Sequence, residues 1–154
     1  MATTFLTQEG YQTLQDELDY LRSEKRDEIA KRLHEAMEGG ELIENAEYEA
    51  AKNEQAFVEG RIKELEIILA TARVVDESQK EAGVIHIGSN VTIRDEDGSK
   101  ETYMIVGAAE ANPIKGKISN ESPIGKALLN RKKGEEVEVE APDGSFKIKI
   151  LKVT

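Results

Sequence analysis

The sequence predicts an α+β protein, in which an antiparallel hairpin of two helices precedes a small, mostly antiparallel sheet with one helix. Two observations lead to this prediction. Apolar residues recur at helical spacing as far as about residue 75, and a glycine pair divides that stretch. From about residue 82 apolar and polar residues alternate instead, and turn residues separate the alternating runs.

The first helix is predicted to begin after Thr7, whose hydroxyl is a suitable cap. Around Lys25 its apolar stripe shifts by one residue, as at an irregular point in a heptad pattern. Gly39 and Gly40 end the helix, because glycine readily adopts the left-handed conformation of a helix C-terminus. The stripe comprises Tyr11, Leu14, Leu18, Leu21, Ile29, Leu33 and Ala36.

The second helix has a stricter spacing of three and four residues, which is typical of a coiled coil. Gln55 is the one polar member of its stripe. Two helices of about 30 residues, joined by a short turn, would bury their stripes against each other as a coiled-coil hairpin about 45 Å long. This hairpin is predicted to cover residues 1–75. The second stripe comprises Tyr48, Ala51, Gln55, Val58, Ile62, Leu65, Leu69 and Ala72.

The second domain is predicted to cover residues 82–154, after a polar linker over residues 76–81. One short helix interrupts its strands, with Ser122 as the cap and Pro123 at the first helical position. The expected strands are residues 84–87, 90–93, 102–106, 137–140 and 146–150.

Composition excludes several classes of protein. The 154 residues include 21 Lys and Arg, 31 Asp and Glu, two His and no Cys, which gives a net charge of −10. This charge argues against binding duplex nucleic acid through a basic surface, and the lack of cysteine excludes disulfides and Cys-ligated zinc. No apolar run reaches the roughly 20 residues that span a bilayer, so we expect a cytoplasmic protein without membrane contact.

The negative charge is densest around the glycine pair. Solvated helix faces account for many acidic runs, but Glu35 and Glu38 lie at the C-terminal end of the first helix, where the helix dipole disfavours them. The sequence therefore suggests a function for acids at this turn. The run, without a Lys or Arg inside it, comprises Glu35, Glu38, Glu41, Glu44, Glu47 and Glu49.

The turn Gly40-Glu41-Leu42-Ile43-Glu44-Asn45-Ala46-Glu47-Tyr48 closely resembles that of the Gre transcript-cleavage factors of bacterial RNA polymerase. Residues 6–11, 50–55, 59–62 and 122–129 look like the same family, so the likeness covers essentially the whole chain. It implies a coiled-coil hairpin followed by an FKBP-like domain. It also implies a monomeric transcription elongation factor that is not itself an enzyme, because the polymerase supplies the active site.

The resemblance implies that the hairpin enters the secondary channel of the polymerase and there promotes the cutting of backtracked RNA. Glu41 and Glu44 would then help to hold the second catalytic Mg²⁺, which is shared with the polymerase and not bound stably by the factor alone. Two positions depart from the family pattern: Glu41 stands where the family has aspartate, and Ile43 is apolar. Compared with aspartate, the longer Glu41 side chain moves its carboxylate outward and adds a rotatable bond that must be ordered.

Two further groups of residues follow from the resemblance. Glu121, Ser122, Pro123 and Ile124 are expected to contact the polymerase, and capping of the short helix is a structural role that the same loop can fill. A basic group on the first helix would face the transcript in the elongation complex, or would instead pair with acids of the same or the opposing helix. This group comprises Lys25, Arg26, Lys31 and Arg32.

Three alternative functions remain at this point. A Gre-fold factor with an acidic tip could occupy the channel and inhibit transcription. The FKBP-like domain suggests a prolyl isomerase or chaperone, although residues 76–154 contain only Tyr103 and Phe146 as aromatic residues. A generic coiled-coil adaptor would explain the hairpin but not its acidic turn.

Overall fold

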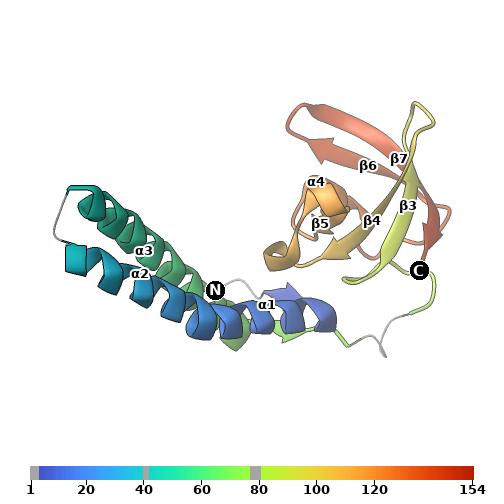
Figure 1. Ribbon diagram of the computed structural model, residues 1–154. Coiled ribbons are helices and arrows are strands. Elements are labelled where there is room, and N and C mark those ends of the chain that lie inside the picture. Colours follow the sequence, from blue (N-terminus) through green and yellow to red (C-terminus); the bar gives the residue numbers. More distant parts are fainter. Residues whose placement is uncertain (1–3, 40–41, 77–80) are drawn as a thin grey trace. The chain divides into compact units, whose positions relative to one another are not determined.

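The computed structural model describes residues 4–39, 42–76 and 81–154, with only the backbone of Gly39 and of residues 42–45 (Figure 1). Contacts divide the chain into two units: Gln12–Thr71, and Met1–Tyr11 together with Ala72–Thr154. The first is the helical hairpin and the second contains the sheet. The predicted α+β class is confirmed.

The hairpin unit consists of two long helical arms. The first arm is α1 (Gln8–Tyr20), a π-helical turn η1 (Leu21–Lys25) and α2 (Arg26–Gly39), and the second is α3 (Leu42–Thr71). Figure 1 shows α2 and α3 running side by side in opposite directions. Members of both predicted stripes are buried between the arms: Leu14, Leu18, Ile29, Ala36, Ala51, Val58, Ile62 and Leu65.

The π-helical turn lies where the sequence predicted an irregularity, since it ends at Lys25. A π turn adds a residue to the helical repeat, so it changes the direction in which the following side chains point. Ile29, one turn later, is again buried at 2% exposure. The shift in the stripe is therefore absorbed by a local change of helix type.

The second unit is built on a five-stranded sheet in the order β5-β4-β3-β7-β6. Its pairings are antiparallel except that β5 runs parallel to β4, so the predicted mostly antiparallel sheet is confirmed with one exception. A register shift between Thr92 and Ile93 interrupts the β3–β7 pairing. The strands are β3 (Asn90–Arg94), β4 (Lys100–Val106), β5 (Lys117–Ser119), β6 (Glu136–Ala141) and β7 (Gly144–Val153).

The core of this unit is aliphatic. Short helices η3 (Ala108–Glu110), η4 (Pro113–Lys115) and α4 (Pro123–Leu128) connect the strands, and Leu128 of α4 is completely buried. Tyr103 and Phe146, the two aromatic residues, pack partly buried against this core. The core residues are Ile85, Val91, Ile93, Ile105, Ile118, Leu128, Val137, Val139, Ile148 and Ile150.

The predicted strand over residues 84–87 is wrong. Val84 forms only an isolated bridge with Lys132, and Gly83 and Gly88 have φ angles of 82° and 96° that bend the chain on either side. Ile85 is nevertheless fully buried, and its backbone bonds to Asn130 and Arg131. The apolar alternation here belongs to a loop anchored by one isoleucine.

The N-terminal segment packs with the sheet unit rather than with the hairpin alone. Strand β1 (Phe5–Leu6) pairs in parallel with β2 (Arg73–Val74). Thr7 donates from its backbone N and from Oγ1 to the Glu110 carboxylate, at 2.8 and 2.7 Å, and Oγ1 accepts from the Gly10 backbone N at 2.9 Å. Thr7 is thus the predicted helix cap. The hairpin was predicted to cover residues 1–75, whereas residues 4–11 group with the sheet unit.

Within the described residues, no helix combines the length and the apolar character needed to cross a membrane.

Candidate functional site

The predicted acidic tip lies where the two helical arms meet. Helix α2 ends at Gly39, where the sequence predicted a helix stop, and α3 begins at Leu42 and runs in the opposite direction (Figure 1). Glu41 lies outside the described residues. Glu44 belongs to the first turn of α3, but its side chain, like that of Ile43, also lies outside the described part. The roles of Glu41 and Glu44 therefore stay predictions.

The described flanks of this turn carry exposed carboxylates. Glu35 and Glu38 lie near the end of α2, whose last turn has no basic residue, and Glu47 and Glu49 lie in α3. Glu38 is 3.1 Å from Nε2 of His34, a contact that is an ion pair only when the histidine is protonated. The helix dipole disfavours acids at the end of α2, so these residues do not owe their place to helix stability.

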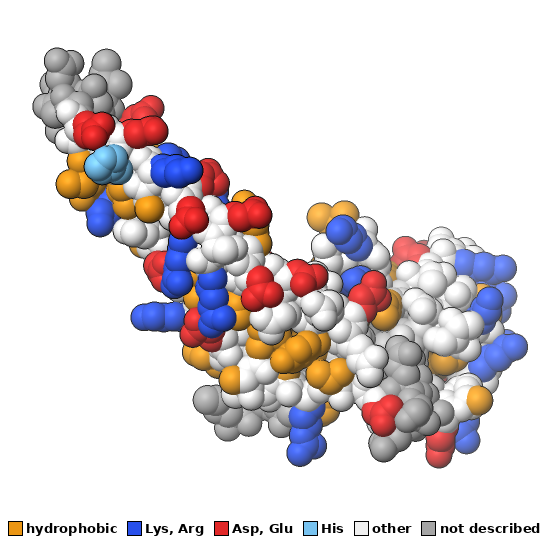
Figure 2. All heavy atoms as spheres, turned by 60° about the horizontal axis from the view of Figure 1, so that its bottom comes forward, with side chains coloured by type: hydrophobic (Ala, Val, Ile, Leu, Met, Phe, Trp, Pro, Cys, Tyr) orange, Lys and Arg blue, Asp and Glu red, His pale blue; other side chains and the backbone are white. Residues whose placement is uncertain are grey.

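The predicted basic group is largely engaged within the hairpin. Lys25 Nζ is 2.7 Å from Glu54, and Arg32 binds the other oxygen of the same carboxylate. Arg26 donates two hydrogen bonds of 2.8 Å to Glu59. Figure 2 shows bases and acids interleaved along the hairpin.

These pairs explain the direction of the pKa shifts. Hydrogen bonds from Lys25 and then Arg32 lower the pKa of Glu54, and the hydrogen bond from Arg26 lowers that of Glu59. The same bonds raise the pKa values of the three bases. Among the described residues Lys31 has no such partner, so it is the member of the group whose charge is not engaged within the hairpin.

The predicted docking loop is tightly built. Ser122 Oγ accepts from the Gly125 backbone N at 3.1 Å and donates to the Ser119 carbonyl at 2.6 Å, which confirms the predicted cap. Glu121 donates from its backbone N to Ser119 Oγ at 3.0 Å. A Cβ on Gly125 would lie 2.0 Å from the Ser119 carbonyl oxygen, so no larger residue fits without movement. The loop therefore presents its outward side chains from a fixed backbone.

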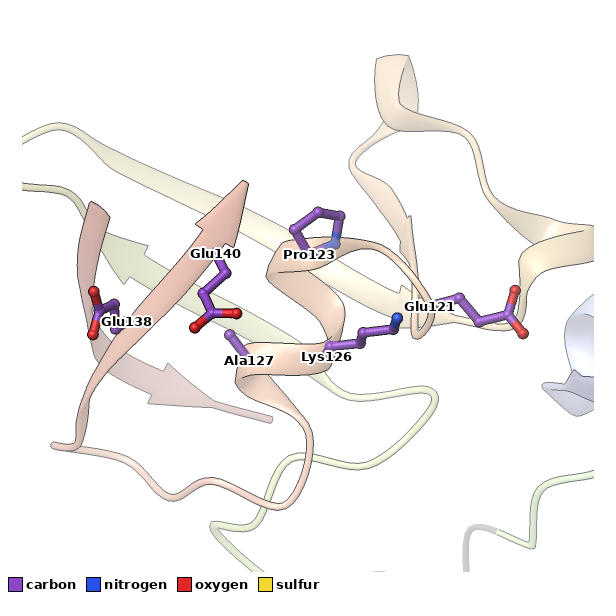
Figure 3. A pocket seen from close by; sticks show the side chains of 6 residues that line it. All are labelled: Glu121, Pro123, Lys126, Ala127, Glu138 and Glu140. Atoms are coloured by element: carbon purple, nitrogen blue, oxygen red, sulfur yellow. The ribbon is translucent and has the colours of Figure 1, made fainter. Parts of the chain in front are cut away.

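An open pocket of about 360 Å³ adjoins this loop, between α4 and β6 (Figure 3). It combines Glu121 and Pro123, two predicted docking residues, with residues that the sequence analysis did not select. The alternation of buried Val137 and Val139 with exposed glutamates was the available signal, because it places Glu138 and Glu140 on the outer face of β6. The lining residues are Glu121, Pro123, Lys126, Ala127, Glu138 and Glu140.

Neither described unit offers a complete metal site. Among the side chains that the structure describes, no group of three or more His, Asp or Glu is placed to hold an ion. Carboxylates nonetheless suit Mg²⁺, which takes oxygen ligands and retains water. The two predicted tip carboxylates fit such an ion as part of a ligand set, not as the whole of it.

Two family models match the chain in sequence order. "Transcription elongation factor, N-terminal" matches residues 4–74, and "Transcription elongation factor, GreA/GreB, C-term" matches residues 79–154. The chain belongs to the GreA/GreB family. The hairpin thus corresponds to the N-terminal GreA/GreB model, and the sheet with its predicted docking loop to the C-terminal one.

GreA/GreB relatives match over nearly their whole length. Transcription elongation factor GreA of Clostridium kluyveri is 50% identical over 149 residues, which is 96% of this chain and 94% of the relative. GreA of Chloroflexus aggregans is 50% identical over 151 residues, 97% of this chain and 96% of the relative. Among solved structures, GreA factor homolog 1 (Gfh1) of Thermus thermophilus is 35% identical, with 99% of both chains covered and a TM-score of 0.47.

Proposed function

We propose that this GreA/GreB family member acts with bacterial RNA polymerase and stimulates its cleavage of backtracked RNA 3′ ends. The observation that carries the proposal is the match of both family models in order, with an acidic turn between the two helical arms. The protein acts as an accessory factor in the cytoplasm. The hydrolytic site belongs to the polymerase, whose secondary channel the hairpin enters.

The tip contributes carboxylate oxygens to that site. Glu41 and Glu44 are three residues apart in the sequence, and Glu44 belongs to the first turn of α3. When bound, the second Mg²⁺ activates and positions a water molecule for attack on the RNA phosphate. Two carboxylates leave most coordination positions to the polymerase and water, so the shared ion binds weakly to the free factor.

The sheet unit provides the surface that binds the polymerase. The start of α4 carries the four predicted contact residues, Glu121, Ser122, Pro123 and Ile124. The Ser122 cap and the close packing of Gly125 hold their backbone in one arrangement. A rigid surface loses little conformational entropy on binding. Affinity for the polymerase and stimulation of cleavage would then depend on different units of the chain.

The pocket beside α4 gives no support to the prolyl isomerase alternative. The pocket beside α4 is lined by charged and small residues, without an aromatic side chain. Tyr103 donates its hydroxyl hydrogen to Glu101, a bond that is the first cause of a Tyr103 pKa raised to about 12, and Phe146 packs on the core. Neither aromatic residue lines that pocket.

The test is cleavage of RNA in a stalled, backtracked polymerase complex. Addition of the protein is expected to accelerate cleavage, and Glu44→Ala to reduce the maximal stimulated rate by about 100-fold, because several kcal/mol of charge stabilisation is lost. Glu49→Ala, an exposed glutamate of the same helix, is the matched control and should retain the parent rate.

A Glu44→Ala protein that stimulated cleavage as well as the parent would contradict the role of the tip. A parent protein that slowed both elongation and cleavage would instead identify an inhibitory factor. Both measurements use the same complex, so the two outcomes are directly comparable.

A further inference from the structure

The apolar seam between the helical arms is interrupted by polar residues about halfway along the hairpin. Lys25, at the end of the π-helical turn, has only 20% of its side chain exposed. Gln55 of α3 is half-buried in the predicted stripe. The seam therefore contains a polar section between apolar ones.

Glu54 joins both arms in this section. Its two carboxylate oxygens bind Lys25 Nζ, at 2.7 Å, and Arg32. The two bases are seven residues apart, about two helical turns, so a single acid on α3 contacts two points of the first arm. Lys25 also lies 3.5 Å from Glu28, but that contact is within its own arm and does not relate the arms to each other.

The seam changes in character along the hairpin. Level with Glu54 and toward the base of the hairpin, the buried residues are large, including Ile29, Val58, Ile62 and Leu65. Between Glu54 and the acidic turn, the buried residues of the described arms are Ala36 and Ala51, and the larger Leu33 and Tyr48 are only half-buried. Alanine buries little apolar area and fills no distinctive hole, so this end of the seam discriminates poorly between alternative registers.

We propose that Glu54 is a positioning residue, which fixes the register of α2 against α3 near the acidic turn by holding Lys25 and Arg32 together. In coiled coils, charged residues that flank the apolar seam set the pairing of the helices through ion pairs across them, because other registers leave these charges unpaired. The consequence for the tip rests on the proposed function. A slip of one helical turn moves a side chain by about 5.4 Å, whereas Mg²⁺ requires oxygens at about 2.0–2.1 Å in nearly ideal geometry.

The register is measurable without polymerase. The chain has no cysteine, so Met37→Cys and Ile67→Cys introduce two unique sites for spin labels, one on each arm. Both native side chains are exposed, at 69% and 57%, and neither takes part in the Glu54 contacts. The distance between the labels runs largely along the hairpin and therefore reports a slip of one arm past the other.

Variants at Glu54 are compared with the parent in this labelled background. Glu54→Lys places a third base beside Lys25 and Arg32, and Glu54→Gln removes the charge with little change in size. The triple variant Lys25→Glu, Arg32→Glu, Glu54→Lys reverses all three charges and restores the attraction. Glu66→Gln is the matched control, since Glu66 also pairs across the arms, with Arg22 at 2.7 Å, but both partners are about half exposed.

The parent and Glu66→Gln are expected to give one narrow distance distribution. Glu54→Lys should broaden it or add a component displaced by about 5 Å, and Glu54→Gln should do so to a smaller extent. The triple variant should return the narrow distribution. In the backtracked complex, Glu54→Lys should lower the maximal stimulated cleavage rate about tenfold at an unchanged half-saturating concentration, because loss of positioning affects chemistry while the sheet unit still binds.

An unchanged distribution in both Glu54→Lys and Glu54→Gln would overturn the proposal. So would a folded triple variant that remained broad, because charge pairing would then not set the register. If the parent protein fails to stimulate cleavage, the proposed function fails, and the label distances still decide the role of Glu54.

Discussion

The predicted docking loop, at the start of α4, is held in place by other forces than the hairpin. Around α4, short hydrogen bonds of Ser119 and Ser122 and the close packing of Gly125 fix the backbone. In the hairpin, charged pairs such as Lys25–Glu54 and Arg26–Glu59 supplement a narrow apolar seam. Packing against backbone atoms is insensitive to salt and pH, whereas exposed charge pairs respond to both.

This difference suggests a division of labour. The loop that is expected to bind the polymerase has a fixed shape. Salt and pH should not change that shape, because hydrogen bonds and close packing hold its backbone. Charge pairs contribute to the hairpin along its length, so its helical order should vary with salt concentration and pH. Binding and chemistry can therefore be perturbed separately.

Among changes that separate these two regions, Gly125→Ala should have the larger effect. Its new methyl group would meet the Ser119 carbonyl oxygen at 2.0 Å, and overpacking of this kind costs about 1–3 kcal/mol. The half-saturating concentration for stimulation of cleavage should rise about tenfold, while the rate at saturation stays unchanged. Titration of the variant into the backtracked complex measures both quantities.

Gly60→Ala is the matched control for this substitution. Gly60 lies in α3, and apart from its chain neighbours and the adjoining helix backbone no atom lies within 4 Å of the place that a methyl group would take there, so alanine should fit and stabilise the helix by up to about 1 kcal/mol. If Gly125→Ala bound as tightly as Gly60→Ala, a rigid loop would not be what the polymerase recognises.

A smaller effect is expected from acid on the hairpin. The pKa values of Glu54 and Glu59 are lowered by their basic partners, so the stabilisation is complete above the unfolded pKa of about 4.3. It is lost as the pH falls through the lower folded values. Helical circular dichroism during thermal unfolding should therefore show a hairpin that melts progressively earlier below about pH 4.3.

The double variant Glu54→Gln, Glu59→Gln isolates the contribution of these two acids. Its melting temperature should depend less on pH than that of the parent, because the two titrating groups are absent. Equal pH dependence in both proteins would show that other carboxylates are responsible.

The sequence was sufficient to predict features that depend on local patterns. Helical spacing predicted both arms, the shift near Lys25 marked the π-helical turn, and Thr7 and Ser122 are the predicted caps. Each of these depends on residues a few positions apart. The FKBP-like character of the sheet unit stays a prediction.

Features that depend on distant parts of the chain were not predictable from the sequence. The bonds between Thr7 and Glu110 join residues 103 positions apart, and no local pattern indicates them. The run at residues 84–87 has strand-like alternation, but bends at Gly83 and Gly88 leave it as a loop. Ion pairing of Lys25, Arg26 and Arg32 was one of two open interpretations, and the choice depended on where α3 places Glu54 and Glu59.

We propose that tip carboxylates help the polymerase to hold a catalytic Mg²⁺. The most direct measurement is the rate of cleavage of a backtracked complex across a Mg²⁺ titration, with and without saturating protein. The protein should lower the Mg²⁺ concentration needed for half-maximal cleavage, and Glu44→Ala should abolish this shift. A protein that raised the cleavage rate by the same factor at every Mg²⁺ concentration would contradict it.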